Sequence, residues 1–149
     1  MDNELARKTL DRRFVAIPAE ALHAPHRGWI RAIRDALGMT ATQLAKRMGV
    51  TQPRIATLEQ AERTGAVTLA SLEKAADALG CTLVYALVPR QSLEQAIHDR
   101  AEEKARQQLA RVRHSMALED QATSASALAD ELHALTQRYI HDPRGLWDD

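Results

Sequence analysis

Four consecutive residues near the middle of the chain, Thr51-Gln52-Pro53-Arg54, combine polar and charged side chains with a stiff backbone. They stand directly before apolar Ile55 and Leu58, which are spaced as on one face of a helix. Proline fits the first turn of a helix because its φ is already helical and its missing amide hydrogen would have no partner there. Amide and guanidinium groups at a helix start can form paired hydrogen bonds with nucleobase edges. These residues are therefore the first candidates for chemistry.

The elements around these residues must form two helices that meet at a fixed angle. Across residues 41–60, small Ala45 stands where the helices approach closely, and Gly49 stands where the turn requires a positive φ. The inward positions beside the turn and along the second helix are apolar, namely Val50, Ile55 and Leu58. This spacing predicts a helix-turn-helix motif, in which the N-terminal residues of the second helix enter the major groove of DNA.

On this interpretation one face of the motif contacts double-stranded DNA. Gln52 is suited to adenine and Arg54 to guanine, while Lys46, Arg47 and Arg63 are suited to phosphates and would make binding salt-dependent. The full set of predicted DNA-binding residues is Thr40, Gln43, Lys46, Arg47, Thr51, Gln52, Pro53, Arg54, Thr57, Gln60 and Arg63. The alternative is that Thr51-Gln52-Pro53 is merely a well-formed helix cap.

Four helical patterns follow one another over residues 28–37, 40–48, 51–62 and 68–79. Each is closed by a glycine, as helices commonly are: Gly38, Gly49, Gly65 and Gly80. Thr40 and Gln43 have the spacing of a capping box at the start of the second helix. We expect Trp29, which shares its helix with Ile30 and Ile33, to lie in the core.

The period changes after Gly80. The stretch CTLVYALVP, residues 81–89, is apolar and β-branched, which predicts a short buried strand. A strand needs a partner for its backbone. That partner is either RRFVAIP, residues 12–18, or the same strand of a second subunit. The residues predicted to form the dimer strand are Leu83, Val84, Tyr85, Ala86, Leu87 and Val88.

The predicted fold class is therefore mainly α: a lambda-repressor-like helix-turn-helix domain with one short dimerising β-strand. This domain covers residues 28–90, after an N-terminal arm over residues 1–27 that Pro18 and Pro25 interrupt. Residues 91–149 form a C-terminal helical extension with two apolar stripes, separated by EDQATSAS, residues 119–126. Trp147 is expected to anchor the tail.

Charge distribution, cysteine count and the length of apolar runs limit the classes of function that the chain can have. The chain has 20 Lys and Arg against 20 Asp and Glu, yet residues 27–63 carry seven basic residues against three acidic ones. A basic segment of this kind is compatible with nucleic acid, although a mild excess is by itself more often just a solvated face. The single cysteine, Cys81, excludes an internal disulfide. Apolar runs are too short for a membrane span or signal peptide, so we expect a cytoplasmic protein.

The sequence nominates no catalytic residue, cofactor or metal site. His23 and His26 are three residues apart, but the proline between them spoils helical spacing, and the other histidines are scattered. There is no glycine-rich phosphate loop and no nucleophile in a triad setting. We therefore do not expect an enzyme.

Residues 28–80, with LGMTATQLAKRMGVTQPRIATLEQ and TLASLEKAADALG, closely resemble the XRE or phage Cro/C1 repressor helix-turn-helix family. That resemblance implies a structural ion pair between Arg34 on the first helix and Glu59 near the end of the recognition helix. The family often has Gln after the Thr that opens its second helix. Ala41 stands there in this chain, so Thr40, Gln43 or Lys46 would have to supply that phosphate contact.

A narrower resemblance covers about residues 8–105, through LDRRF, HRGWIRAIRDALGMT and TLEQAERTGAVTLASLEKAADALGCTLVYALVPR. These segments look like the bacterial mobile mystery protein A family, whose genes tend to accompany a Fic/Doc-type partner, mobile mystery protein B. The resemblance implies an antitoxin-like regulator that represses its own operon. Inhibitory motifs of Fic antitoxins resemble Ser115-x-x-x-Glu119, except that Asp120 follows here.

The predicted function is thus a sequence-specific, homodimeric transcriptional repressor that reads a palindromic operator with two recognition helices about 34 Å apart. It would be the antitoxin of a Fic-type toxin–antitoxin pair. The alternative is a toxin-neutralising interaction module, a Fic inhibitor in which the helix-turn-helix serves only as a scaffold.

Overall fold

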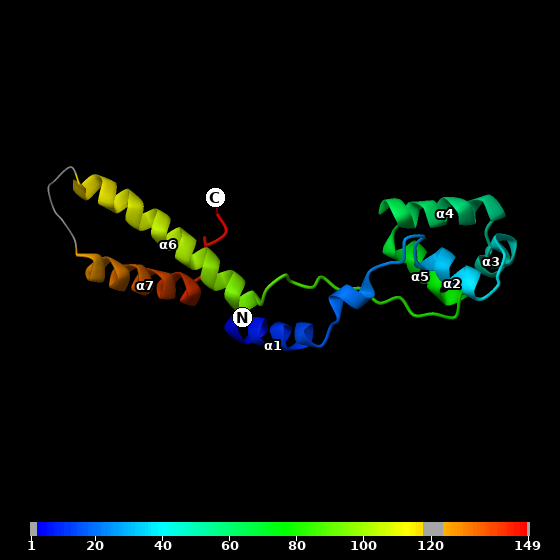
Figure 1. Cartoon of the computed structure of the whole chain (residues 1–149), viewed down its shortest axis with the longest axis horizontal. Coiled ribbons are helices and arrows are strands. Elements are labelled where there is room, and N and C mark those ends of the chain that lie inside the picture. The colour runs from blue at the N-terminus through cyan, green and yellow to red at the C-terminus, as the bar shows by residue number, and fades with distance from the viewer. Residues whose placement is uncertain (1–2, 118–123, 149) are drawn as a thin grey trace. The chain divides into compact units, whose positions relative to one another are not determined.

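The computed structural model describes residues 3–117 and 124–148, and most of these residues are helical. A short 3-10 helix covers Ala19–Leu22, and the described residues contain seven α-helices: α1 (Asn3–Val15), α2 (Trp29–Ala36), α3 (Ala41–Met48), α4 (Gln52–Thr64), α5 (Leu69–Ala78), α6 (Leu93–Ala117) and α7 (Ala125–His141) (Figure 1). The prediction of a mainly α fold is confirmed. The arm contains α1, a helix that the sequence pattern does not predict.

The chain divides into two compact units. The four-helix unit is Pro18–Leu87 and contains α2 to α5, whereas the hairpin unit joins Met1–Ile17 to Val88–Asp149 and contains α1, α6 and α7. The four-helix unit is therefore inserted, in sequence, between α1 and α6.

The core of the four-helix unit receives side chains from each of its helices. The buried apolar residues are Ile30, Leu44, Ala45, Ile55, Leu58, Ala75 and Leu79. Trp29 is not among them: it begins α2 and remains 43% exposed. The expectation that Trp29 lies in the core is therefore wrong, because the inward face of α2 is supplied by Ile30 and not by its neighbour.

Local signals set the ends of α3. Thr40 accepts a hydrogen bond from the Gln43 amide at 3.2 Å, and the Gln43 side chain accepts one from the Thr40 amide at 2.8 Å, which completes a capping box. At the other end, Gly49 has a φ of +68°, a left-handed conformation that favours glycine. This turn sets the direction in which α4 leaves α3.

The predicted strand over residues 81–89 is not present. These residues belong to no helix or strand, and within the described chain the backbone of residues 82–88 forms no hydrogen bond. The physical reason is the absence of a partner: Arg12 to Val15, half of the N-terminal candidate, are wound into α1. Apolar and β-branched composition favours extended backbone, but a ladder needs a second segment.

In the hairpin unit, α6 and α7 lie side by side (Figure 1). Their core is small, with Ile97, Ala101 and Leu146 buried and Tyr139 and Ile140 packed against them. The tail is held through Leu146, whose side chain is fully buried, while Trp147 is 61% exposed. The expected anchor role of Trp147 thus belongs to the residue before it.

Polar contacts reinforce both the tail and α1. Lys104 Nζ donates to the Gly145 carbonyl at 2.6 Å, and Arg100 Nε donates to the Leu146 carbonyl at 3.1 Å. At the start of α6, the Asp11 carboxylate accepts hydrogen bonds from the amides of Leu93 at 2.7 Å and Glu94 at 3.2 Å. Asp11 therefore supplies to α6, from 82 residues earlier in the chain, a cap for amides that a helix start leaves unpaired.

Candidate nucleic-acid interface

The inner face of α4 is fixed to the domain by apolar burial and by one ion pair. Ile55 and Leu58 are buried, and between α4 and α2 the guanidinium of Arg34 meets the carboxylate of Glu59. Arg34 Nε lies 2.7 Å from Glu59 Oε1 and Nη2 lies 3.3 Å from Oε2. The side chains are only 11% and 10% exposed, and the hydrogen bond to Glu59 raises the pKa of Arg34. The guanidinium of Arg34 therefore remains charged.

A second contact between the same helices involves Glu62, a residue whose role the sequence pattern does not predict. Glu62 Oε1 accepts a hydrogen bond from the Trp29 amide at 2.8 Å, and Oε2 accepts one from the Ile30 amide at 3.1 Å. Glu62 lies one turn after Glu59, on the same side of α4, and Gly28 immediately precedes α2. Because the contact joins residues 33 and 32 positions apart, no pattern local to α4 identifies it.

The outer face of the motif carries all eleven residues predicted to contact DNA, and each of them is solvent-exposed. Thr51 is the N-cap residue of α4, but its side chain makes no capping hydrogen bond, and Pro53 lies in the first turn. The Thr57 hydroxyl donates to the Pro53 carbonyl at 3.2 Å, within the helix. The start of α4 is thus formed without the Thr51 hydroxyl, which stays available to a ligand.

Several predicted contact residues have free functional groups. Within residues 3–117 and 124–148, no hydrogen bond or ion pair engages the side chains of Lys46, Gln52, Arg54, Gln60 and Arg63. Side chains of this length that are neither buried nor paired remain able to reach a groove or a phosphate. The start of α4 and the ends of α3 and α4 therefore present unpaired donors to solvent.

Three other predicted contact residues already have partners. Thr40 and Gln43 bond each other in the capping box, which leaves the Gln43 amide nitrogen as its free group. Arg47 Nε donates to the Ala78 carbonyl at 2.6 Å, at the end of α5. Arg47 therefore ties α3 to α5, and only the remaining nitrogens of its guanidinium can meet a phosphate.

The positive charge of the segment is partly compensated on α2. Asp35 lies 3.8 Å from Arg27 Nη1, 3.7 Å from Arg31 Nε and 2.9 Å from Arg34 Nη1. Glu59 and Glu62 are turned toward α2. The three acids of residues 27–63 are thus engaged with α2, and the uncompensated charges are those of α3 and α4.

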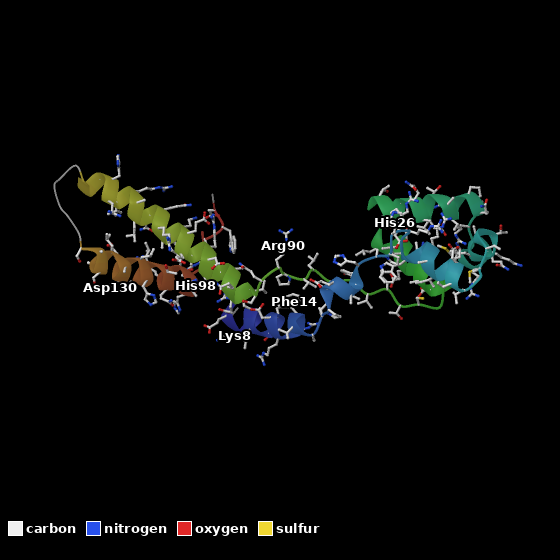
Figure 2. The ribbon with its side chains drawn as sticks, in the orientation of Figure 1. Lys8, Phe14, His26, Arg90, His98 and Asp130 are labelled. Atoms are coloured by element: carbon white, nitrogen blue, oxygen red, sulfur yellow. The ribbon has the colours of Figure 1, made fainter. Side chains whose placement is uncertain are left out.

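In the described parts of the chain, no group of three or more His, Cys, Asp or Glu is arranged to hold a metal. His26 lies in the four-helix unit, whereas His98 and Asp130 lie on α6 and α7 (Figure 2). None of the described helices combines the length and the apolar character that spanning a bilayer requires.

Comparison with known families agrees with the geometry. Residues 30–85 match the family model described as helix-turn-helix. They form a helix-turn-helix domain of the XRE type, a domain of DNA-binding transcription regulators. No curated protein and no solved structure matches the chain. The narrower resemblance to mobile mystery protein A is not confirmed and stays a prediction.

Only part of the predicted Fic-inhibitory motif lies among the residues that the structure describes. Ser115 lies on α6, and its hydroxyl donates to the Arg111 carbonyl at 3.3 Å. Glu119 lies outside the described residues.

Proposed function

We propose that the protein is a sequence-specific transcriptional repressor that inserts α4 into the major groove of its operator. The observation that carries this proposal is the division of α4 into two faces. Its inner face is fixed by Ile55, Leu58 and the buried Arg34–Glu59 pair. Its outer face presents Gln52 and Arg54, two of the side chains best suited to reading base edges, without other partners among the described residues.

The exposed residues then divide by role. Gln52 and Arg54 read bases, with Thr51, Pro53, Thr57 and Gln60 shaping or flanking that contact. Lys46 and Arg63, with the free nitrogens of Arg47, neutralise phosphates and provide sequence-independent affinity. Thr40 and Gln43, at the start of α3, supply the phosphate contact for which Ala41 lacks a side chain.

The protein acts as a homodimer on a palindromic operator, and the exposed segment after α5 supports this part of the proposal. Val84, Tyr85 and Leu87 are 76%, 69% and 90% exposed, which is unusual for three large apolar side chains within four residues. A second copy of residues 83–88 would cover them and would pair with their backbone.

The DNA-binding proposal is tested with the substitutions Q52A and R54A in the full chain. A duplex enriched by the wild-type protein from a randomised pool serves as the operator probe, and an unenriched pool duplex as the non-specific probe. Each substitution should weaken operator binding by about 1–3 kcal/mol and leave non-specific binding nearly unchanged. Unchanged gel-shift affinity for the enriched duplex, or failure to enrich any duplex, would contradict the proposal.

The dimer is tested separately by L87D, with E73A on α5 as a control that also alters an exposed residue. Light scattering during size exclusion should give a dimer for the wild type and for E73A, and a monomer for L87D. A monomeric wild-type protein at micromolar concentration would overturn this part.

A second candidate function, the antitoxin of a Fic/Doc-type toxin, is favoured by a groove of about 290 Å³ in the hairpin unit. Arg106 and Arg113 on α6 line it together with Leu109, Leu128 and Leu132. From residue 104 to residue 114, α6 carries four Lys or Arg and no acid. An apolar groove with arginine edges suits an acidic amphipathic helix of a protein partner.

The antitoxin candidate predicts that R106E/R113E abolishes binding to a Fic-domain protein encoded by the neighbouring gene, while Q52A/R54A does not. Titration calorimetry measures both. The candidate is wrong if that gene encodes no Fic-domain protein, or if the arginine substitutions leave its affinity unchanged.

A further inference from the structure

We infer that Glu62, together with Gly28, is a positioning residue that sets the angle of the recognition helix α4 and thereby the sequence discrimination of the protein. This inference rests on the proposed DNA-binding function and goes beyond it. It assigns a role in DNA reading to a residue on the side of α4 toward α2 and to the glycine that precedes α2.

Helix α4 contacts α2 through polar side chains at two separate places. Glu62 bonds the amides of Trp29 and Ile30 at the start of α2, at 2.8 and 3.1 Å, and Glu59 bonds Arg34 in its last turn. At 1.5 Å per residue these contacts are about 7 Å apart along α2. With Ile55 and Leu58 holding α4 in the core, the two separated polar contacts restrict its remaining freedom to rotate against α2.

The contact between Glu62 and the start of α2 depends on the absence of a side chain at residue 28. Gly28 has a φ of +81°, and a Cβ at this position would lie 2.6 Å from Glu62 Oε2 and 2.9 Å from its Cδ. Any other residue would both strain the backbone and displace the carboxylate. The contact therefore requires both Gly28 and Glu62, although they are 34 positions apart in the sequence.

The residues proposed to read bases lie far enough from the Arg34–Glu59 pair for a small rotation of α4 to displace them. Gln52 lies seven residues before Glu59, or about 10 Å along the helix axis. A pivot of about 10° at the Arg34–Glu59 pair would move the start of α4 by about 2 Å, well beyond the 0.5 Å that a working site tolerates. Base contacts would be lost, while long Lys and Arg side chains could still follow the phosphates.

The carboxylate also determines which helix start can bind an anion. Free amides and the helix dipole attract negative charge to the N-terminus of α2. Glu62 already occupies the amides of Trp29 and Ile30. A phosphate of the DNA therefore does not find these donors free.

The experiment compares E62A and E62Q with the wild-type full chain on the enriched and pool duplexes defined above, at a temperature where circular dichroism shows all variants folded. Loss of two charge-assisted hydrogen bonds should weaken operator binding about tenfold in E62A. E62Q should lie between E62A and the wild type, because its single amide oxygen can accept from one of the two amides. Affinity for pool DNA should stay within about twofold and its salt dependence should not change.

Two controls separate positioning from stability. E73A removes an exposed carboxylate from α5 and should leave the operator-to-pool ratio unchanged. In E62A, hydrogen exchange at Trp29 and Ile30 should accelerate, whereas exchange in the middle of α4 should not. G28A should reduce the ratio in the wild-type background and have a smaller effect in E62A, because the clash with the carboxylate is then absent.

The experiment separates the positioning role of Glu62 from the DNA-binding function itself. If the wild type enriches a duplex and folded E62A retains the operator-to-pool ratio, the positioning role is wrong while DNA binding stands. Equal loss of operator and pool binding in E62A would also overturn it, since that pattern indicates general destabilisation. Failure of the wild type to enrich any duplex contradicts the proposed function itself.

Discussion

At the scale of single residues, the Arg34–Glu59 pair links α2 to α4 within the four-helix unit. Both side chains are almost fully withdrawn from water, and Arg34 Nη1 also donates to the Met39 carbonyl at 2.9 Å. A buried pair of this kind contributes little over an apolar pair of equal shape, but breaking it leaves an uncompensated charge in the interior. The pair therefore specifies a geometry more than it supplies net stability.

We predict that R34M lowers the free energy of unfolding of the four-helix unit by about 3–5 kcal/mol, because Glu59 would remain buried without its partner. The double substitution R34M/E59L should cost less than R34M alone. Urea unfolding measures both. R27M is the matched control, since Arg27 is 63% exposed and its ion pair to Asp35 is long. A loss below about 1 kcal/mol for R34M would contradict the burial argument.

A second residue-scale prediction concerns Asp142, after the end of α7. Arg144 donates from Nε at 2.8 Å and from Nη2 at 2.9 Å, and this hydrogen bonding lowers the pKa of Asp142 to about 2 from 3.8. Because the folded pKa is depressed, the pair stabilises the fold above pH 4 and that contribution is lost as the pH falls toward 2. An NMR titration of the carboxyl should give the low value, and R144Q should return it toward 3.8.

The residues of the candidate interface differ in how far the sequence could identify them. The outward positions of Gln52 and Arg54 could be predicted because an N-cap, a proline and an apolar period fix the exposed face of α4 locally. The role of Glu62 could not be predicted in that way, since it depends on a hydrogen bond from the amide of Trp29, 33 positions earlier. The partial engagement of Arg47 with Ala78 was hidden for the same reason.

At the scale of elements, helix ends are predictable and extended segments are not. Gly49 and the Thr40–Gln43 capping box act within a few residues, so a pattern read along the chain finds them. Whether residues 81–89 form a strand depends on a partner elsewhere, and composition carries no information about that partner. Helix α1 escaped prediction because it buries no residue and is held by polar contacts to α6.

We predict that D11A destabilises the hairpin unit by about 1–2 kcal/mol, because two amides at the start of α6 would lose their acceptor. The Ser92 hydroxyl, which accepts from the Gln95 amide at 3.1 Å, would remain. Unfolding followed by Trp147 fluorescence in a W29F background measures this loss. D130A, on exposed α7 surface, should have an effect within about 0.5 kcal/mol. Equal effects of the two substitutions would show that Asp11 is not an effective cap.

At the scale of the whole molecule, two units with separate cores share one chain. Each unit contains one tryptophan, Trp29 in the four-helix unit and Trp147 in the hairpin unit. The variants W29F and W147F therefore convert fluorescence into a reporter for one unit at a time.

We predict that L146A shifts the unfolding midpoint reported by Trp147, at a cost of about 2–5 kcal/mol, because Leu146 is fully buried in the small core of the hairpin unit. The transition reported by Trp29 should not move. Urea titrations of both single-tryptophan variants measure the two midpoints. A parallel shift of the Trp29 transition would mean that the units unfold together and that one free energy describes the whole chain.

The cap that Asp11 places on α6 also orders events during synthesis. Helix α1 leaves the ribosome before the four-helix unit, and the amides of Leu93 and Glu94 follow Asp11 by 82 and 83 residues. At 5–20 residues per second that interval is about 4–16 seconds. The whole four-helix unit emerges within it and has time to fold, whereas α1 waits as an exposed, highly charged segment. The hairpin unit thus closes only after the four-helix unit has been synthesised.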